Sequence, residues 1–316
     1  KPSMGYFARR SHEIVSMKTC PVAACRIDEA FSIVMKALPS LSIPPYDERG
    51  GKGLLRHAIF RQSIEKADTL VSLVVAGHLS SRQRAALQER LLPSLQNAFP
   101  GLRGLTLNMN VTSGNAIVGP NTEILWGDGL LEESLPPFVF EYDTTAFFQI
   151  NSKQAHALYQ YTASAARLSG DESVLELFSG IGSLSAFLTQ SSRHVTAVEE
   201  WEPAVRMMRN NMARNGIEDK TTVIAGAVES IVPALEERFD VVVLDPPRTG
   251  CNPSVLHKVL SLKPQRIVYV SCNPATLARD ATILFDGGFT IENIACFDMF
   301  PQTVHVETVA LLHRRG

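Results

Sequence analysis

Short apolar runs alternate with longer amphipathic stretches throughout the second half of the chain. An amphipathic pattern over residues 152–168 predicts a long helix. Runs rich in Val and Ile predict the strands that follow it, at residues 174–178, 194–199, 221–226, 240–245, 266–271, 289–297 and 305–313. Strands separated by helical stretches indicate a mostly parallel sheet covered by helices. The expected fold class is therefore α/β and Rossmann-like.

The first half of the chain predicts a smaller α/β unit. Two strand patterns precede a helical pattern over residues 80–99, which starts with serine and contains a proline near its end. Further short strands are interrupted by Gly, Pro and Asn. These predicted strands are residues 54–62, 69–77, 104–111, 115–120 and 121–129. The expected domains are residues 1–140 and 141–316.

The composition is that of a globular protein that can bury two hydrophobic cores of modest size. It has 316 residues, 45% of them hydrophobic, and no apolar run reaches the roughly 18 residues of a membrane span. Five cysteines without framework spacing predict reduced thiols rather than disulfides, and a cytoplasmic location. The chain begins with Lys1 rather than methionine, so we expect it to be part of a longer protein.

Charge is unevenly distributed along the chain. The net charge is −2, but residues 1–66 hold eleven Lys and Arg against six Asp and Glu. This local surplus of five cations fits an RNA-binding front, because phosphate contacts need cations. An ordinary solvated face explains it equally well.

Residues with binding chemistry lie at the ends of the predicted strands, where doubly wound sheets bind ligands. Gly180 and Gly182 follow the first of these strands, and Ser183 can help to start the helix after them. Glu199 ends the next strand, where a carboxylate can accept two ribose hydroxyls. Asp245 ends the fourth and precedes two prolines, which stiffen the turn. The glycine turn alone fits a nicotinamide site almost as well.

Two further strands place a thiol and a carboxylate in reach of the same edge. Cys272 follows the run RIVYVS in a polar turn, SCNP, that would expose the thiol. Glu307 lies in the last predicted strand, and His305 would share its face by the period of two. Cys251 is a competing nucleophile, although its context is a loop entering a helix.

The motifs FFQIN, DPPR and SCNPATLARD and the final carboxylate occur in one order along the chain. In that order they resemble the RNA 5-methyluridine methyltransferase family. The resemblance implies a class I methyltransferase domain, a central RNA-binding domain and S-adenosylmethionine as the donor. It implies that Cys272 is the nucleophile and Glu307 the base. Donor contacts are carried over to Gln149, Phe178, Gly180, Glu199 and Asp245.

The family chemistry explains why a thiol and a base are paired. Carbon 5 of uracil is a poor nucleophile, and addition of a thiolate to carbon 6 activates it. A base must then remove the carbon 5 proton so that the thiolate can leave. The resemblance implies a uridine in structured RNA as substrate, with 23S ribosomal RNA expected first and transfer RNA as the alternative. A monomer is expected.

Other functions remain open from the residues. An RNA cytosine-5 methyltransferase would have a second cysteine after the prolines, where this chain has Arg248. An amino-group methyltransferase would have an aromatic residue there. A catalytically idle RNA-binding or assembly protein would need no intact nucleophile.

Cys20 has two interpretations. Many members of the family bind a [4Fe–4S] cluster through three closely spaced cysteines and a fourth in a CPV context, which Cys20 matches. The first three ligands are absent from this sequence, and Cys25 lacks the required partners. Cys20 is therefore either a cluster ligand of a longer chain or a small apolar filler.

Overall fold

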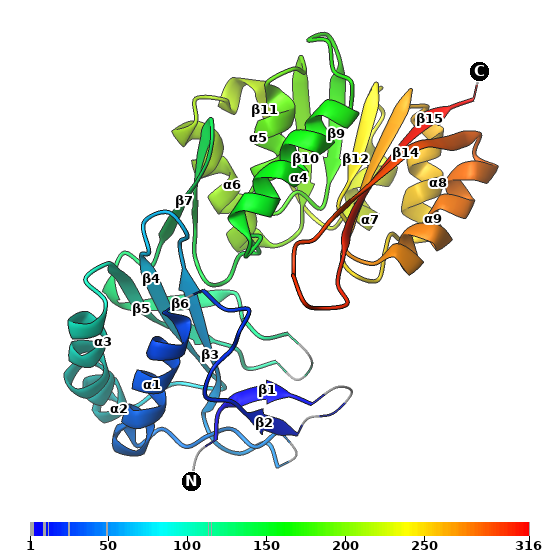
Figure 1. The fold of residues 1–316 in the computed structure, drawn as a ribbon. Helices are drawn as coiled ribbons and strands as arrows, with labels where there is room; N and C mark the ends of the chain where they lie inside the picture. Colours follow the sequence, from blue (N-terminus) through cyan, green and yellow to red (C-terminus); the bar gives the residue numbers. More distant parts are fainter. Residues whose placement is uncertain are drawn as a thin grey trace. The chain divides into compact units, whose positions relative to one another are not determined.

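The computed structural model describes residues 3–8, 11, 13–24, 26–48, 50–112, 114 and 116–315. The chain forms two compact units, the first made of residues 1–133 and 141–145, and the second of residues 134–140 and 146–316 (Figure 1). Across the described part of the chain, every helix is too short or too polar to cross a bilayer.

The first unit is a four-stranded sheet with helices packed on it. The strand order is β3-β4-β5-β6, with β4 and β5 parallel and the outer pairs antiparallel. The strands are β3 Leu55–Gln62, β4 Thr69–Val75, β5 Leu102–Met109 and β6 Asn121–Gly127. The helices are α1 Ile27–Leu41, α2 Ser81–Ala86, the π-helix η1 Leu87–Leu91 and α3 Leu92–Ala98. A small hairpin, β1 Gly5–Phe7 and β2 Ile14–Ser16, precedes them.

The single helix predicted over residues 80–99 is divided in the structure. Its start is as expected, because Ser80 and Gln83 form a capping box. Pro93 has no backbone N–H to continue the regular bonding, and the turn before it widens into η1. The strand predicted at residues 115–120 was wrong, since residues 116–120 form no strand.

A β-hairpin, β7 Leu131–Leu135 and β8 Phe138–Tyr142, contributes its tip to the second unit. Phe138 stacks edge-on against Phe187 at a centroid distance of 5.3 Å. Asn215 accepts a hydrogen bond from the N–H of Val139 (3.0 Å) and donates one to its carbonyl (2.8 Å). The tip is thereby fixed by both apolar and polar contacts.

The second unit contains a seven-stranded sheet of order β11-β10-β9-β12-β13-β15-β14. Neighbouring strands from β11 to β13 are parallel, whereas β15 is antiparallel to both of its neighbours. The strands are β9 Ser173–Leu177, β10 His194–Glu199, β11 Thr221–Ala225, β12 Val241–Leu244, β13 Arg266–Ser271, β14 Phe289–Phe297 and β15 Glu307–Arg314. The expected α/β, Rossmann-like fold is confirmed.

Helices cover both faces of this sheet (Figure 1). A core of buried residues joins one face to α7 Val228–Ala234, α8 Pro253–Ser261 and α9 Pro274–Asp286. The remaining helices are α4 Ser152–Ala165, α5 Ser183–Thr189, α6 Glu202–Arg214 and the short 3₁₀ turn η2 Glu218–Lys220. The chain builds outward from β9 to β11 and then returns to β12 on the other side of β9. Such a reversal opens a crevice at the carboxyl ends of the strands.

Candidate active site

The turn between β9 and α5 lies at this crevice and departs from ordinary backbone geometry. Phe178, Gly180 and Gly182 all have positive φ angles, of 66°, 56° and 82°. A Cβ atom added at Gly180 would meet nothing within 4 Å, so the backbone there borders open space. A ligand can therefore approach the main chain closely. Phe178 is half-buried and packs on the core beneath the turn.

Glu199 is fixed against this turn from the end of β10. One carboxylate oxygen accepts the N–H of Gly180 (2.9 Å) and the other accepts the N–H of Trp201 (2.7 Å). The acid expected from the sequence and the glycine turn therefore form one structure. Trp201 has its indole Nε1 buried without a hydrogen-bond partner among the described residues. The sequence analysis did not identify this hydrogen-bond donor.

Gln149 also carries an unpartnered polar atom. Its side chain is 5% exposed, and its Oε1 has no hydrogen-bond partner within the described ranges. Its neighbours Phe147 and Ile150 point outward, being 66% and 68% exposed. A buried amide without a partner is costly unless a ligand satisfies it. The atom thus supports the prediction that Gln149 contacts a ligand.

Asp245 follows β12, next to β9 at the reversal point. Its N–H donates to the carbonyl of Leu177 at 3.3 Å, which holds the two strand ends together. Burial, followed by the negative charge of Glu307, raises the pKa of Asp245 to about 7. The two carboxyl groups are therefore close enough for the charge of Glu307 to act on Asp245.

Cys272 and Glu307 are 35 residues apart in the sequence and meet through the antiparallel pairing of β13 with β15. The last register pair is Ser271 with Thr308, so the next residues outward on the two strands are Cys272 and Glu307. The hydroxyl of Thr308 donates to the carbonyl of Ser271 at 3.1 Å and secures this end. Because β15 runs antiparallel, its first residue reaches the edge where the parallel strands end.

The electrostatics of this pair involve a residue that sequence reasoning did not place in the site. Burial, then the charges of Glu307 and Asp245, raise the pKa of the Cys272 thiol, while Arg248 lowers it. Burial likewise raises the pKa of Glu307, and Arg248 again lowers it. Arg248 of the DPPR turn therefore acts on both groups. The sequence feature that could have identified Arg248 is its place in the DPPR turn, directly after Asp245 and the two prolines.

The competing thiol is placed elsewhere. Cys251 is 2% exposed within the core that joins the sheet to α7, α8 and α9. Burial raises its pKa to about 12, against a hydrogen bond to Tyr269 that lowers it. A thiol that is buried and protonated is a poor nucleophile.

His305 does not share a strand face with Glu307. The strand begins at Glu307, and His305 precedes it in an exposed segment where its ring contacts that of Phe300 (6.2 Å between centroids). The period of two applied to residues outside the strand gave the wrong neighbour. Ser183 likewise is the first residue of α5, and its side chain does not cap the helix.

Two polar pairs lie beneath the glycine turn. Glu176, in the middle of β9, is 1% exposed and accepts a hydrogen bond from Ser185 of α5 at 2.5 Å. Burial, then the charges of Asp245 and Glu199, raise the pKa of Glu176 to about 8, although the Ser185 bond lowers it. Tyr159 of α4 is buried and hydrogen-bonded to Ser183. These pairs tie α5 to the sheet and to α4.

Cys20 lies in the first unit as a free, half-buried thiol. Its backbone N–H donates to both oxygens of Asp28, at 2.9 and 3.1 Å. Within the described residues, no three His, Cys, Asp or Glu side chains come together as metal ligands, so these residues do not fit an iron–sulfur cluster. Cys25 lies outside the described residues.

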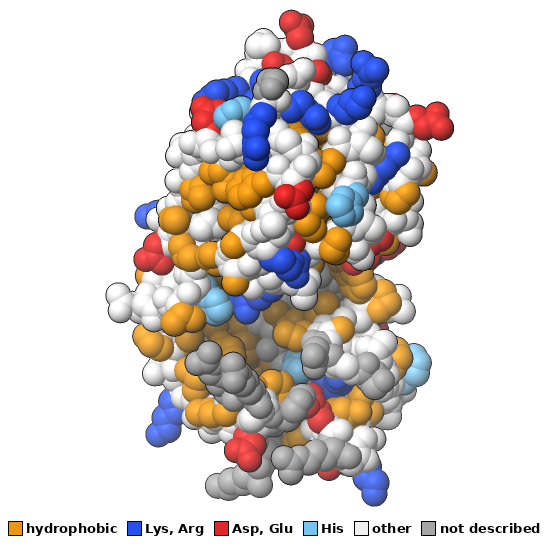
Figure 2. Space-filling view, turned by 90° about the vertical axis from the view of Figure 1, so that its right-hand side faces the viewer, with side chains coloured by type: hydrophobic (Ala, Val, Ile, Leu, Met, Phe, Trp, Pro, Cys, Tyr) orange, Lys and Arg blue, Asp and Glu red, His pale blue; other side chains and the backbone are white. Residues whose placement is uncertain are grey.

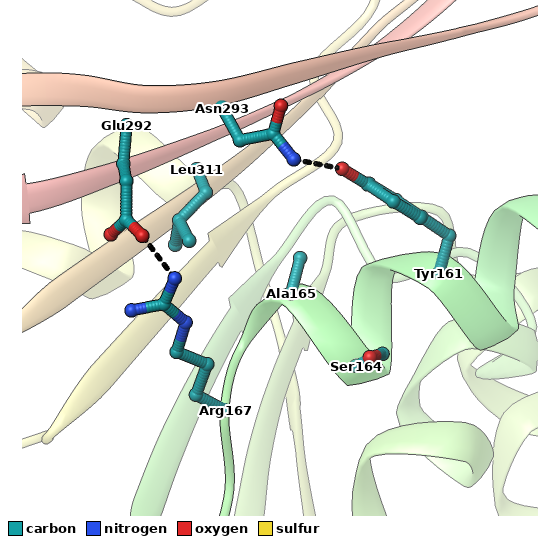
Figure 3. Close-up of a pocket in the computed structure, with 7 residues that line it drawn as sticks. All are labelled: Tyr161, Ser164, Ala165, Arg167, Glu292, Asn293 and Leu311. Atoms are coloured by element: carbon teal, nitrogen blue, oxygen red, sulfur yellow. Dashed lines mark hydrogen bonds and ion pairs between the residues drawn. The ribbon is translucent and has the colours of Figure 1, made fainter.

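A surface cavity of about 340 Å³ lies between α4 and the sheet edge formed by β14 and β15 (Figure 3). An ion pair of Arg167 with Glu292 and a 2.8 Å bond from Asn293 to the Tyr161 hydroxyl cross it. It includes none of the predicted site residues.

The fold and the turn after β9 define a class I methyltransferase. Residues 128–315 match the sequence model of the tRNA (uracil-5-)-methyltransferase family. The chain belongs to this family, is an RNA methyltransferase and uses S-adenosylmethionine as its methyl donor.

Individual relatives agree with this assignment. An uncharacterized RNA methyltransferase of Gloeobacter violaceus is 39% identical over 99% of this chain and 67% of its own length. Another from Listeria monocytogenes is 35% identical over 99% of this chain and 68% of its own. The crystal structure of the Pyrococcus abyssi tRNA (uracil-54, C5)-methyltransferase with S-adenosyl-L-homocysteine matches with a TM-score of 0.75 and 28% identity. That match covers 95% of this chain and 70% of the other.

Proposed function

We propose that this protein methylates carbon 5 of a uridine in RNA through a covalent bond between Cys272 and carbon 6 of the uracil. The observation that carries the proposal is that Cys272, directly after β13, lies opposite Glu307, the first residue of β15. A nucleophile and a base on one strand pair can act on two adjacent ring atoms.

In the proposed reaction the Cys272 thiolate adds to carbon 6, and the ring electrons move toward the carbon 4 oxygen. Bound S-adenosylmethionine would supply an electrophilic methyl group: the enolate electrons form the bond from carbon 5 to that methyl group as its bond to the sulfonium sulfur breaks, which leaves S-adenosylhomocysteine. Glu307 then accepts the carbon 5 proton. The electrons of that C–H bond re-form the ring double bond as the C–S bond breaks, and the thiolate is regenerated.

Five residues are proposed to hold the donor: Gln149, Phe178, Gly180, Glu199 and Asp245. The open space at Gly180 and the unpartnered Oε1 of Gln149 support this arrangement. The two N–H contacts to Glu199 leave further lone pairs of its carboxylate for ribose hydroxyls. Burial and then the charge of Glu307 raise the pKa of Asp245, and a sulfonium cation beside it would favour its charged form.

We propose ribosomal RNA, specifically 23S, as the substrate, with transfer RNA as the second candidate. The similarity to an archaeal tRNA (uracil-54, C5)-methyltransferase favours the second candidate. The face shown in Figure 2 mixes basic, acidic and apolar side chains. We further propose a cytoplasmic monomer, and no step of the reaction passes through an iron–sulfur cluster.

Labelled methyl donor supplied with separated ribosomal and transfer RNA tests the function. The expected product is labelled 5-methyluridine in one fraction only, and Cys272→Ala should give none. Labelled 5-methylcytidine, or label on an exocyclic amino group, would contradict the proposal. Unlabelled RNA in every fraction, from protein that binds the donor, would favour the idle RNA-binding alternative.

A further inference from the structure

The loop that follows Asp245 is held by one face of α9. Asn273 caps this helix, and Thr276, Arg279 and Asp280 follow at spacings of three or four residues, which places all four side chains on one side. The same helix begins just after Cys272. The position of α9 therefore determines where the loop lies relative to the Cys272 thiol.

The contacts are made to main-chain groups of three loop residues, Arg248, Thr249 and Cys251. The carbonyl of Arg248 accepts hydrogen bonds from the Asn273 amide (3.1 Å) and the Thr276 hydroxyl (3.4 Å). Arg279 Nη2 donates to the carbonyls of Thr249 (2.9 Å) and Cys251 (3.2 Å). The N–H of Cys251 donates to Asp280 Oδ2 at 2.8 Å.

Asp280 anchors this face from inside the core. It is fully buried, and its Oδ2 also accepts the Tyr269 hydroxyl at 2.6 Å, while its Oδ1 accepts two bonds from Arg279. Gly250 fits between the parts: its φ is +75°, and an added Cβ would lie 2.5 Å from Arg279 Nη2 and 2.6 Å from Asp280 Oδ2. The loop thus has little room to shift.

We propose that Asn273, Thr276, Arg279 and Asp280 form a positioning clamp, which fixes Arg248 at a set place relative to Cys272 and Glu307. The proposal rests on the proposed function and deepens it, because it assigns these four residues a role in placing a charged group near the proposed nucleophile and base. The part of the SCNPATLARD motif that forms the start of α9 then has a role in addition to that of the thiol.

The clamp controls the charge that the thiol experiences. The groups that act on Cys272 are Glu307 from β15, Asp245 after β12, and Arg248 from the clamped loop. Arg248 is the cation of this set, and it lowers the pKa of the thiol. A loop that moves away withdraws this effect, so the pKa of Cys272 should rise and less thiolate should form at neutral pH.

Arg279→Gln in the full chain tests the clamp. Alkylation of Cys272 by iodoacetamide is followed against pH through its own peptide in a mass spectrum, and steady-state methylation is measured in parallel. The expected shift of the alkylation midpoint is upward by about half a pH unit or more. The expected kcat falls about tenfold, with the donor Kd and the RNA KM within about twofold of the wild type.

Arg167→Gln is the matched control. Arg167 is likewise paired with a carboxylate, Glu292, and its side chain is 57% exposed, against 52% for Arg279. The Arg167→Gln variant should leave the alkylation midpoint of Cys272 and the kcat unchanged. The Arg279→Lys variant should recover part of the activity that Arg279→Gln loses. A wild-type midpoint and kcat in folded Arg279→Gln overturn the proposal.

If Arg279→Gln does not fold, Thr276→Val and Arg279→Lys decide the matter. Midpoints that match the wild type in both would overturn the clamp, and upward shifts would support it. Alkylation needs no RNA. If the wild-type protein methylates no uridine, the proposed function is wrong. The clamp is still tested separately, by the pH midpoint of Cys272 alkylation.

Discussion

At the scale of single residues, the charge of Glu307 contributes to the reactivity of the thiol opposite it. After burial, this charge is the largest cause of the raised pKa of Cys272. Glu307→Gln removes the charge, so the thiol pKa should fall and alkylation of Cys272 at pH 7 should become faster than in the wild type. Glu292→Gln on β14 is the control, and equal rates in all three proteins would count against the pairing.

The same substitution should separate the two halves of the proposed reaction. Glutamine keeps the shape of Glu307 but accepts no proton, so methylation could proceed while release from Cys272 stalls. We expect a denaturant-resistant protein–RNA species whose uridine is already methylated. Full turnover by the variant would remove Glu307 from the role of base.

Glu176 should make stability depend on pH. Its pKa is about 8 in the folded protein, against about 4.3 in an unfolded chain, so the folded state binds the extra proton between these values. The free energy of unfolding should therefore fall as pH rises through this window, by up to about 1.4 kcal/mol per pH unit. Denaturant titrations of Glu176→Gln should show a shallower fall. Ser185→Ala keeps the carboxyl group but removes a bond that lowers its pKa, so the fall should persist and extend to higher pH.

At the scale of elements, the two glycines of the turn after β9 should respond differently to the same substitution. A Cβ at Gly182 would lie 2.5 Å from Met212 Cε and 2.7 Å from Met208 Cγ, whereas a Cβ at Gly180 meets open space. Both positions have positive φ, which costs an alanine about 1–2 kcal/mol. Gly182→Ala should therefore lower the melting temperature more than Gly180→Ala. Equal losses would show that the packing of α6 is irrelevant to the turn.

The elements also show where sequence patterns were sufficient. The second-unit strands were predictable because Val- and Ile-rich runs such as 241–244 are buried on both faces and bounded by turns. The division of residues 81–98 was not, because the pattern of apolar residues continues through Pro93 while the hydrogen bonding does not. The strand boundary at Glu307 was also missed, and with it the true position of His305.

The site was predictable only as far as local motifs reach. Gly180, Glu199, Asp245 and Cys272 each lie at the end of a predicted strand or within two residues after it, and the parallel sheet brings these strand ends to one edge. The antiparallel direction of β15, which brings Glu307 level with Cys272, depends on long-range pairing. The bonds from α9 to the loop after Asp245 likewise join segments that no local pattern connects.

At the scale of the whole molecule, charge predicts how the protein holds RNA. The surplus of five cations in residues 1–66 is small, and the remainder of the chain has seven more acids than bases. Filter binding should therefore show weak RNA affinity with a shallow salt dependence, since few phosphates are neutralised. Calorimetry should show that the protein binds S-adenosylmethionine normally even though it binds RNA weakly. Tight, steeply salt-dependent RNA binding would mean that the first unit neutralises many phosphates.

The central claim is that Cys272 bonds to the uracil, and RNA containing 5-fluorouridine tests it most directly. Fluorine cannot leave carbon 5 as a proton does, so the adduct should persist after methyl transfer and survive denaturation. Digestion and mass spectrometry should place the nucleotide on the peptide that carries Cys272, with no adduct in Cys272→Ala and a normal one in Cys251→Ala. A nucleotide found on Cys251, or an adduct that persists in Cys272→Ala, would contradict the claim.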